Sequence, residues 1–461
     1  MTMKVIDMTN PTFPLDFPGT AVITDNGDEV SYAEMKRLTE RWEPSIPARA
    51  LVFLLVGNNL QSLVAYVACI NRGIVPLMLS MEIDGGMLRH LIEVYKPSYV
   101  WRCRDGIAEK IDGGGVDLHP SLALLLTTSG SVGSPKLVRQ SYENISANTS
   151  SIIEYLMLDE TERPITTLPM NYTYGLSIIN THLNVGATIL LTEKTLMQRE
   201  FWNFFTSQNA TSFGGVPYTY EMLDKLLFFR RRLPSLRTMT QAGGKITPEL
   251  HRKFAEYALR EGKHFVVMYG QCEATARMAY LPPEKSLEKI GSMGIAIPGG
   301  QFRLIDENGN VIHDADVTGE LVYEGPNVTL GYAEKAEDLN RWDDFHGILL
   351  TGDMARRDAD GFYSIVGRKK RFLKIFGNRV NLDETERLIK GHFSGIDCAC
   401  GGKDDQMVIY ITDKNMQDIV QEYIAAMTHL NFKAFKVVTV EAIPKNEAGK
   451  TLYGVLETLN V

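Results

Sequence analysis

The chain has 461 residues, a formal net charge of −8, and 44% hydrophobic and 23% charged residues. At roughly 100–200 residues per domain, this length predicts two to four folding units, each able to bury its own core. The acidic balance gives no global attraction to nucleic acid or to anionic lipid. We therefore expect no nucleic-acid partner, and an anionic ligand would need a local positive site.

The cysteines and the apolar stretches indicate in which cellular compartment the protein resides. The five cysteines are odd in number and form no CxxC pair; they are Cys69, Cys103, Cys272, Cys398 and Cys400. This pattern favours a reducing compartment over a disulfide framework and argues against a zinc site. Residues 1–17 lack the apolar core of a signal peptide, and polar residues interrupt the most apolar stretch, residues 48–81. We therefore expect no membrane span and a cytoplasmic protein.

Strand and helix patterns alternate along the first part of the chain. Val52–Val56 is apolar and rich in strand formers, Leu60–Ile70 has helical periodicity, and Ile74–Leu79 is apolar again. Strand, helix and strand in this order predict a parallel βαβ unit. Further strand candidates are Ala187–Leu191, Ser212–Val216 and His264–Met268, and further helix candidates are Gln198–Ser207 and Pro248–Arg260. The alternation predicts an α/β domain with mostly parallel sheets.

After residue 290 the predicted strands become short and are separated by turn sequences. They are Phe302–Ile305, Gly319–Tyr323, Ile348–Thr351 and Phe362–Val366. This spacing predicts an antiparallel or barrel-like subregion. A charged break at residues 367–371 leaves about 90 residues, enough for a small α+β domain. The predicted fold class is α/β: a large N-terminal domain, residues 1–368, of parallel sheets with helices plus the barrel-like subregion, followed by a small C-terminal domain, residues 369–461.

The strongest chemical signal is the segment TTSGSVGSPK at residues 127–136, directly after the apolar run Leu122–Leu126. A strand that ends in a Ser/Thr/Gly loop can present backbone N–H groups and hydroxyls to phosphate oxygens. Lys136 adds a positive charge. A flexible linker is the alternative, but it would not normally combine this apolar lead-in with a Pro-Lys exit. The segment is not a Walker A loop, which needs GxxxxGK[ST].

This loop resembles the signature of the adenylate-forming superfamily, which contains acyl-CoA synthetases, aryl acid ligases, luciferases and peptide-synthetase adenylation domains. The chain departs from that signature at Val132 and Leu137, where threonine and glycine are usual, and Val132 removes a hydroxyl. The resemblance implies that the loop binds ATP, and it covers about residues 20–455. The loop residues implied to contact the nucleotide are Thr128, Ser129, Gly130, Ser131, Gly133 and Lys136.

Five later motifs follow in the order of the family. The segment QAGGK at 241–245 implies that Gly243 and Gly244 lie against adenine. The segment YGQCE at 269–273 resembles YGxTE. It implies nucleotide contacts from Tyr269, Gly270, Gln271 and Cys272, and a Mg²⁺ ligand in Glu273. Cys272 replaces the usual threonine, which removes a second hydroxyl.

The last three motifs lie toward the C-terminus. The TGD at residues 351–353 implies that Asp353 binds the ribose hydroxyls. In the stretch 367–377 the resemblance implies that Arg368 contacts ribose or phosphate and that Lys370 is the hinge of a mobile C-terminal domain. A basic nuclear-localisation or nucleic-acid patch is the alternative for this stretch. Residues 443–450 resemble the catalytic-lysine loop, which implies that Lys450 reaches the substrate carboxylate and α-phosphate.

The segment LPMNYTYGL at residues 168–176 resembles the family's acid-pocket motif. The predicted pocket residues are Asn171, Tyr172, Tyr174, Phe213, Gly214 and Gly243. Tyr172 falls where acyl-CoA synthetases often have histidine or an aromatic residue, so it joins Lys450 and Lys136 as a catalytic candidate. No aspartate is present to pair with an α-amino group, so the motif favours a non-amino carboxylic acid. Arg277 could bind a second polar group, although a structural ion pair is the simpler interpretation.

The resemblance implies two half-reactions, in which a carboxylate and MgATP give acyl-AMP and pyrophosphate, and a thiol then displaces AMP. The thiol would be coenzyme A or the phosphopantetheine of a separate acyl carrier protein. Two alternatives remain open. The chain could be a regulatory paralogue with weak catalysis, because Val132 and Cys272 remove hydroxyls, or its acceptor could be an amine.

Overall fold

The computed structural model describes residues 13–127, 136–369, 371–376, 378–393, 395–445 and 451–458. Contacts between Cα atoms divide the chain into two compact units, which are described separately. The large unit comprises the described residues up to Phe302 together with Tyr323–Leu349. The small unit comprises Arg303–Val322 and the described residues from Leu350 onward. The mixed α/β fold class is confirmed, whereas a domain boundary at residue 368 stays a prediction.

The first sheet of the large unit contains the predicted βαβ unit. β3 (Leu51–Val56) and β4 (Val75–Ser80) are parallel, and α2 (Leu60–Asn71) connects them. Every residue of β3 is buried, which explains why its sequence is a continuous apolar run rather than an alternating one. The side chain of Asn59 caps α2 by accepting a hydrogen bond from the Ser62 N–H. The sheet order is β18-β8-β7-β4-β3-β5-β6. Its other strands are β5 (Tyr99–Arg102), β6 (Ile107–Lys110), β7 (Leu122–Thr127), β8 (Leu137–Ser141) and β18 (Tyr332–Ala333).

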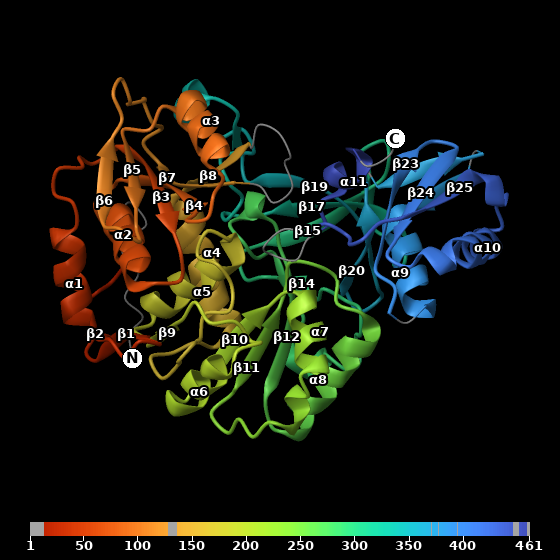
Figure 1. Cartoon of the computed structure of the whole chain (residues 1–461), viewed down its shortest axis with the longest axis horizontal. Helices are drawn as coiled ribbons and strands as arrows, with labels where there is room; N and C mark the ends of the chain where they lie inside the picture. The colour runs from red at the N-terminus through yellow and green to blue at the C-terminus, as the bar shows by residue number, and fades with distance from the viewer. Residues whose placement is uncertain are drawn as a thin grey trace. The chain divides into compact units, whose positions relative to one another are not determined.

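A second sheet has the order β10-β11-β12-β13-β14 (Figure 1). The parallel strands are β10 (Ser212–Gly215), β11 (Thr238–Gln241) and β12 (His264–Tyr269), followed by the short antiparallel strands β13 (Ala279–Tyr280) and β14 (Ile295–Ala296). One face packs on α6 (Arg199–Ser207), α7 (Pro217–Lys225) and α8 (Pro248–Arg260) through aromatic rings. The other face contacts α4 (Tyr142–Leu156) and α5 (Thr173–Asn184).

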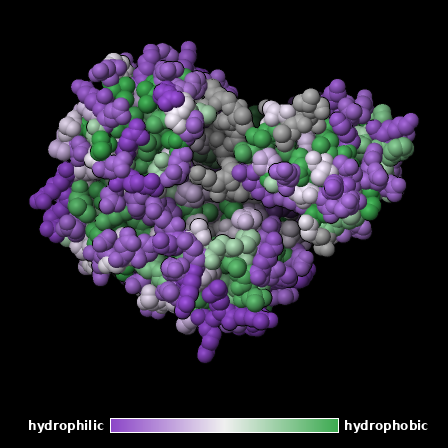
Figure 2. Space-filling view, viewed as in Figure 1, coloured by the Kyte–Doolittle hydropathy of each residue, from purple (hydrophilic) through white to green (hydrophobic). Residues whose placement is uncertain are grey.

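A third, three-stranded sheet pairs β9 (Ile189–Leu191) with β1 (Thr20–Thr24), and β1 with β2 (Glu29–Ser31). The predicted strands on either side of α6 are confirmed, but β9 and β10 lie in different sheets. Helices α1 (Tyr32–Arg41) and α3 (Gly85–Tyr95) complete the unit. In α1 the buried residues recur with helical spacing, and the opposite face is hydrophilic (Figure 2). Among the helices described, none is both long and apolar enough to span a bilayer.

The small unit contains most of the sheet β16-β15-β17-β19-β20. Its strands are β15 (Gln301–Ile305), β16 (Val311–Ile312), β17 (Thr318–Glu324), β19 (Ile348–Arg357) and β20 (Tyr363–Arg368). β19 and β20 pair antiparallel, as predicted, and β19 continues past the predicted end at Thr351. The TGD sequence therefore lies within a strand rather than in a turn.

The remainder of the small unit is α+β and has its own hydrophobic core. β21 (Phe372–Ile375) pairs antiparallel with β22 (Asn378–Asn381), and a three-stranded sheet follows in the order β23-β24-β25. Its strands are β23 (Cys398–Lys403), β24 (Gln406–Ile411) and β25 (Phe435–Thr439), and its helices are α9 (Leu382–His392), α10 (Gln417–Thr428) and α11 (Tyr453–Thr458).

Candidate functional site

Lys136, Tyr332 and Glu273 of the large unit form one connected group. Lys136 lies just before β8, and its Nζ is 2.5 Å from Glu334 Oε1 and 5.6 Å from the centre of the Tyr332 ring. The Tyr332 hydroxyl donates a hydrogen bond of 2.7 Å to Glu273 Oε1. β18 pairs with β8, and this pairing brings Tyr332 to Lys136. Lys136 and Glu273 are therefore joined through Tyr332, which the sequence did not indicate.

This group has the chemistry of a site for a metal-bound phosphate. Burial and the neighbouring charge of Glu273 raise the pKa of Tyr332, so its phenol remains a hydrogen-bond donor. The Glu273 carboxylate is a hard oxygen ligand of the kind that Mg²⁺ takes together with phosphate oxygens. Over the described ranges, no group of three or more His, Cys, Asp or Glu side chains could hold a metal ion by itself. A single carboxylate such as Glu273 fits a Mg²⁺ ion whose other ligands are phosphate oxygens.

The loop that carries Glu273 is tightly folded. A Cβ on Gly270 would lie 1.7 Å from the Ala276 carbonyl oxygen, so the backbone admits only glycine there. Thr275 and Ala276 have φ values of +54° and +101°, which L-residues rarely adopt. Strain of this kind costs about 1–3 kcal/mol per residue and occurs often at functional sites. Gln271 Nε2 donates to the Tyr269 hydroxyl at 3.1 Å within the same segment.

Four of the predicted acid-pocket residues come together on α5 and the ends of β10 and β11. The Tyr172 hydroxyl lies 2.6 Å from where a Cβ on Gly243 would sit, and Gly243 has φ +81°. Both the backbone conformation and the tyrosine therefore require glycine at this position. The Tyr172 and Tyr174 rings meet edge to face at 6.2 Å. Tyr174 donates to Thr240 Oγ1 at 2.7 Å, and its hydroxyl lies 3.0 Å from a Cβ position on Gly214.

Cys272, which precedes Glu273 in the chain, interacts electrostatically with a tyrosine of each group. Burial, and secondarily the charge of Cys272, raises the pKa of Tyr172 to about 12. Cys272 also contributes to the raised pKa of Tyr332, after burial and Glu273. Cys272 therefore lies near both the pocket tyrosine and the tyrosine bound to Glu273.

Other predicted residues are separated from these groups or lie outside the described chain. The Phe213 ring points to the opposite face of its strand, where it packs on Phe205, Tyr220 and Phe228. Asn171 is half-buried beside Tyr172, and Gly244 lies against Pro217. The following predicted residues lie outside the described ranges: Thr128, Ser129, Gly130, Ser131, Gly133, Lys370 and Lys450.

Asp353 and Arg368 belong to the small unit, where they are cross-strand neighbours on β19 and β20. Arg368 Nε lies 3.7 Å from Asp353 Oδ1, and the Asp353 side chain is largely buried while that of Arg368 is exposed. The Thr351 hydroxyl accepts a hydrogen bond of 3.1 Å from the Asp353 N–H. The motif thus fixes the carboxylate and leaves its guanidinium partner accessible.

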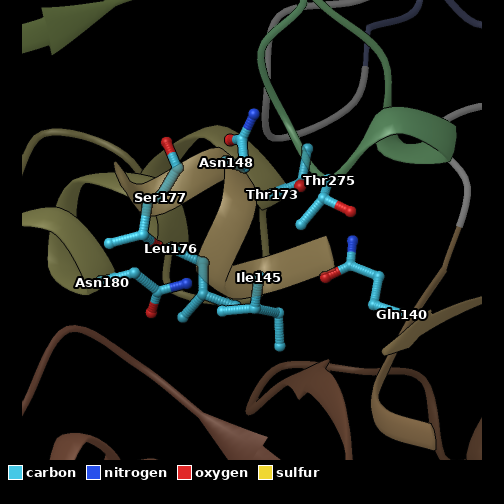
Figure 3. Close-up of a pocket in the computed structure, with 9 residues that line it drawn as sticks. Gln140, Ile145, Asn148, Thr173, Leu176, Ser177, Asn180 and Thr275 are labelled. Atoms are coloured by element: carbon cyan, nitrogen blue, oxygen red, sulfur yellow. The ribbon is translucent and has the colours of Figure 1, made fainter. Parts of the chain in front are cut away.

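A small cavity between α4 and α5 does not fit an acid substrate. Its volume is about 10 Å³, enough for roughly one water molecule. Its lining is mostly polar, and Figure 3 shows Gln140, Asn148 and Thr275 around it. It is lined by Gln140, Ile145, Asn148, Thr149, Thr173, Leu176, Ser177, Asn180 and Thr275. Asn148 Oδ1 is buried and has no partner among the described residues, which suits a bound water molecule.

Comparison with known proteins identifies relatives of the chain. Residues 116–333 match the family described as "AMP-binding enzyme". The chain is 26% identical to indoleacetate–CoA ligase of Aromatoleum aromaticum, over 81% of this chain and 80% of that protein. It is 24% identical to 2-succinylbenzoate–CoA ligase of Listeria innocua, over 94% of this chain and 95% of that protein.

Solved structures support the fold. O-succinylbenzoate coenzyme A synthetase from Bacillus subtilis in complex with AMP superposes with a TM-score of 0.79, at 20% identity and 95% coverage of both chains. ATP-bound MatB from Rhodopseudomonas palustris gives a TM-score of 0.78, at 22% identity and 97% coverage of both chains. At these identities, the likeness shows a common fold.

Proposed function

We propose that the chain, whose residues 116–333 match the AMP-binding enzymes, is an adenylate-forming enzyme that activates a non-amino carboxylic acid with MgATP and transfers the acyl group to coenzyme A. The observation that carries the proposal is the connected group formed by Lys136, Tyr332 and Glu273, together with the Tyr172–Gly243 contact. Cys272 interacts electrostatically with the tyrosine of each. A phosphate site beside an acid pocket is the arrangement that acid adenylation requires.

In the first half-reaction, a carboxylate oxygen of the acid attacks the α-phosphorus and pyrophosphate leaves. Glu273 would hold Mg²⁺ with the phosphates, and Lys136 would contribute positive charge where the leaving group departs. Gly243, Gly244 and the Tyr269–Cys272 segment would contact the nucleotide, and Asp353 would accept hydrogen bonds from the ribose hydroxyls. Lys450 would neutralise the charge that develops as the acyl oxygen attacks.

In the second half-reaction, a thiol sulfur attacks the acyl carbonyl and AMP leaves. Tyr172 would line the path of the acyl group. Its raised pKa, about 12, makes it a hydrogen-bond donor rather than a base near neutral pH. It would therefore orient the carbonyl instead of removing the proton of the thiol.

The relatives support coenzyme A as the acceptor, since several are named as CoA ligases. The relatives are named for different acids, so the class of acid is inferred from the residues of this chain. Residues 168–176 contain no aspartate to bind an ammonium group. A phosphopantetheinyl carrier protein remains the second candidate acceptor.

The test is pyrophosphate release from MgATP over a panel of acids, each with coenzyme A, with a phosphopantetheinylated carrier protein, or with neither. We expect acid-dependent release with non-amino acids and AMP formation that depends on coenzyme A. Release with α-amino acids alone would contradict the proposed acid class. No release with any acid would favour the regulatory paralogue, for which Val132 and Cys272 are the motivation.

A further inference from the structure

A guanidinium group is buried beside the proposed acid pocket without a carboxylate partner. Arg277 is only 2% exposed. Its Nη1 donates to the Tyr155 hydroxyl at 3.2 Å and to Met268 Sδ at 3.4 Å, and its Cζ lies 5.1 Å from the centre of the Tyr174 ring. Within the described part of the chain, no Asp or Glu forms an ion pair with Arg277. The sequence-based expectation of a structural ion pair is therefore wrong for the described residues.

One edge of this guanidinium makes no hydrogen bond to the described residues. Both hydrogen bonds use Nη1, and Nε is buried with no partner among the described side chains and backbone. The N–H groups of Nε and Nη2 point in parallel, which is the geometry that binds both oxygens of a carboxylate. Burial raises the pKa of the Tyr155 and Tyr174 phenols, so these neighbours stay neutral and supply no negative charge.

The position of Arg277 is fixed by its backbone. The Arg277 carbonyl accepts hydrogen bonds from Asn148 Nδ2 at 2.8 Å and from Asn327 Nδ2 at 3.0 Å. The preceding residue, Ala276, has φ +101°. A buried charge without a counter-charge lowers stability. The fold thus keeps the Arg277 guanidinium in a fixed position although its charge lowers stability. This is expected of a group that binds a ligand.

The guanidinium adjoins the residues assigned to the acid. Tyr174, whose ring faces Arg277, packs in one cluster with Tyr172, Val216 and Ala242. Val216 and Tyr172 border Gly243. Resting on the proposed function, we propose that Arg277 binds a second carboxylate of the substrate, so that the acid activated by this enzyme is a dicarboxylic acid.

The test compares each dicarboxylic acid with its own monomethyl ester, which has the same chain and one charge fewer. The probes are straight α,ω-dicarboxylates from succinate to azelate and the benzene dicarboxylates. For the best diacid, wild type should prefer the diacid over its monoester by about 10- to 100-fold in kcat/KM for pyrophosphate release, as expected for a charge-assisted bidentate pair. Arg277→Met should reduce the preference to about one, and Arg277→Lys should retain part of it.

A second measurement separates a binding role from a structural one. In the absence of any acid, Arg277→Met should raise the midpoint of thermal unfolding, because an uncompensated buried charge is replaced by an apolar chain of similar length. The best diacid, added without ATP, should raise the midpoint of wild type and leave that of Arg277→Met unchanged. Arg260→Met, which removes an exposed guanidinium, is the matched control and should behave as wild type.

The outcomes distinguish this inference from the proposed function. If wild type releases pyrophosphate equally well with diacids and monoesters, the inference is overturned and the function stands. If no acid supports release but a diacid stabilises wild type and not Arg277→Met, the inference stands and the function fails. If Arg277→Met is less stable than wild type and no diacid stabilises either protein, Arg277 is structural and the inference is overturned.

Discussion

At the scale of single residues, the Tyr332 hydroxyl connects the two charged groups of the proposed phosphate site. Tyr332→Phe removes the hydrogen bond to Glu273, and a hydrogen bond to a charged group contributes about 1.5–3 kcal/mol. We expect the KM for MgATP in pyrophosphate release to rise about tenfold, while AMP release from synthetic acyl-AMP and coenzyme A stays unchanged. Tyr99→Phe, on β5 of the first sheet, is the control. An unchanged KM would show that this hydrogen bond has no part in binding MgATP.

Gly243 allows a second test on one residue, because the chain contains a matched control. Alanine at Gly243 would have φ +81° and a Cβ 2.6 Å from the Tyr172 hydroxyl, whereas alanine at Gly262 would have φ +64° and no neighbour within 4 Å. Both variants should lose about 1–2 kcal/mol of stability from the left-handed backbone. Only Gly243→Ala should also lose acid adenylation, and Tyr172→Phe in the same chain should restore part of it. Equal activity of the two alanine variants would contradict a role for the Tyr172–Gly243 contact.

The residue types of these sites were predictable, but some of their neighbours were not. Glu273, Gly243 and Tyr172 belong to short local motifs, and their local sequence carries the signal. Tyr332 and Glu334 have no such motif, since only the long-range pairing of β18 with β8 brings them to Lys136. The direction of the Phe213 ring depends on strand register, because a shift of one residue moves a side chain to the other face of a sheet.

At the scale of secondary structure, the helix α5 contains a buried histidine, His182. His182 Nδ1 lies 2.7 Å from the Ile178 carbonyl oxygen, and Nε2 is buried without a partner among the described residues. Burial lowers the pKa of His182 to about 4, from 6.5 in an unfolded chain. The unfolded chain therefore binds the proton more tightly, so the stability that His182 contributes is complete above pH 6.5 and is lost as the pH falls toward 4.

We expect His182 to account for a loss of about 2 kcal/mol in the free energy of unfolding between pH 7 and pH 5. His182→Asn cannot titrate in this range. Between pH 7 and pH 5 its free energy of unfolding should therefore fall by about 2 kcal/mol less than that of wild type. The measurement is urea denaturation at both pH values. If wild type and His182→Asn lose the same amount, His182 is protonated in the folded protein or does not titrate.

Strand and helix positions were largely predictable, because the periodicity of apolar residues is a local property. β3, α2 and β4 follow the predicted pattern within a residue or two. The sheet to which each strand belongs was harder to predict from the sequence. β9 and β10 flank one helix but pair with different strands, because strand pairing is decided by contacts between residues distant in sequence. The length of β19 was also missed, since the glycine at 352 reads as a turn in isolation.

At the scale of the whole molecule, the predicted hinge Lys370 lies between two firmly held residues of the small unit. Lys369 Nζ lies 2.6 Å from Glu320 Oε2, and its N–H donates to the Gly352 carbonyl at 2.7 Å. Arg371 forms ion pairs of 2.5 Å with both Asp383 and Glu386. Two held neighbours are what a pivot requires, because the dihedral change is then confined to one residue.

Lys370→Pro should therefore impair one half-reaction far more than the other, with adenylation the one retained, because proline fixes φ near −65°. Adenylation is followed by pyrophosphate exchange, and thiolation by AMP release from synthetic acyl-AMP and coenzyme A. Lys370→Ala removes the charge but leaves the backbone free, and it should retain both activities. An equal loss of both rates in Lys370→Pro, with circular dichroism unchanged, would place the hinge elsewhere in residues 368–374.

The Arg371 cluster also bears on how the chain folds during its synthesis. Besides its two carboxylates, Arg371 lies over the Tyr453 ring at 3.8 Å, and the Tyr453 hydroxyl donates to Glu386 Oε2 at 3.1 Å. The cluster thus joins Arg371, just before β21, and α9 to α11 across more than 80 residues of chain. A ribosome releases these segments in order. The Glu386 carboxylate therefore lacks its hydrogen bond from the Tyr453 hydroxyl until Tyr453 has emerged. The large unit can fold while translation continues, whereas this cluster closes only after Tyr453 leaves the exit tunnel.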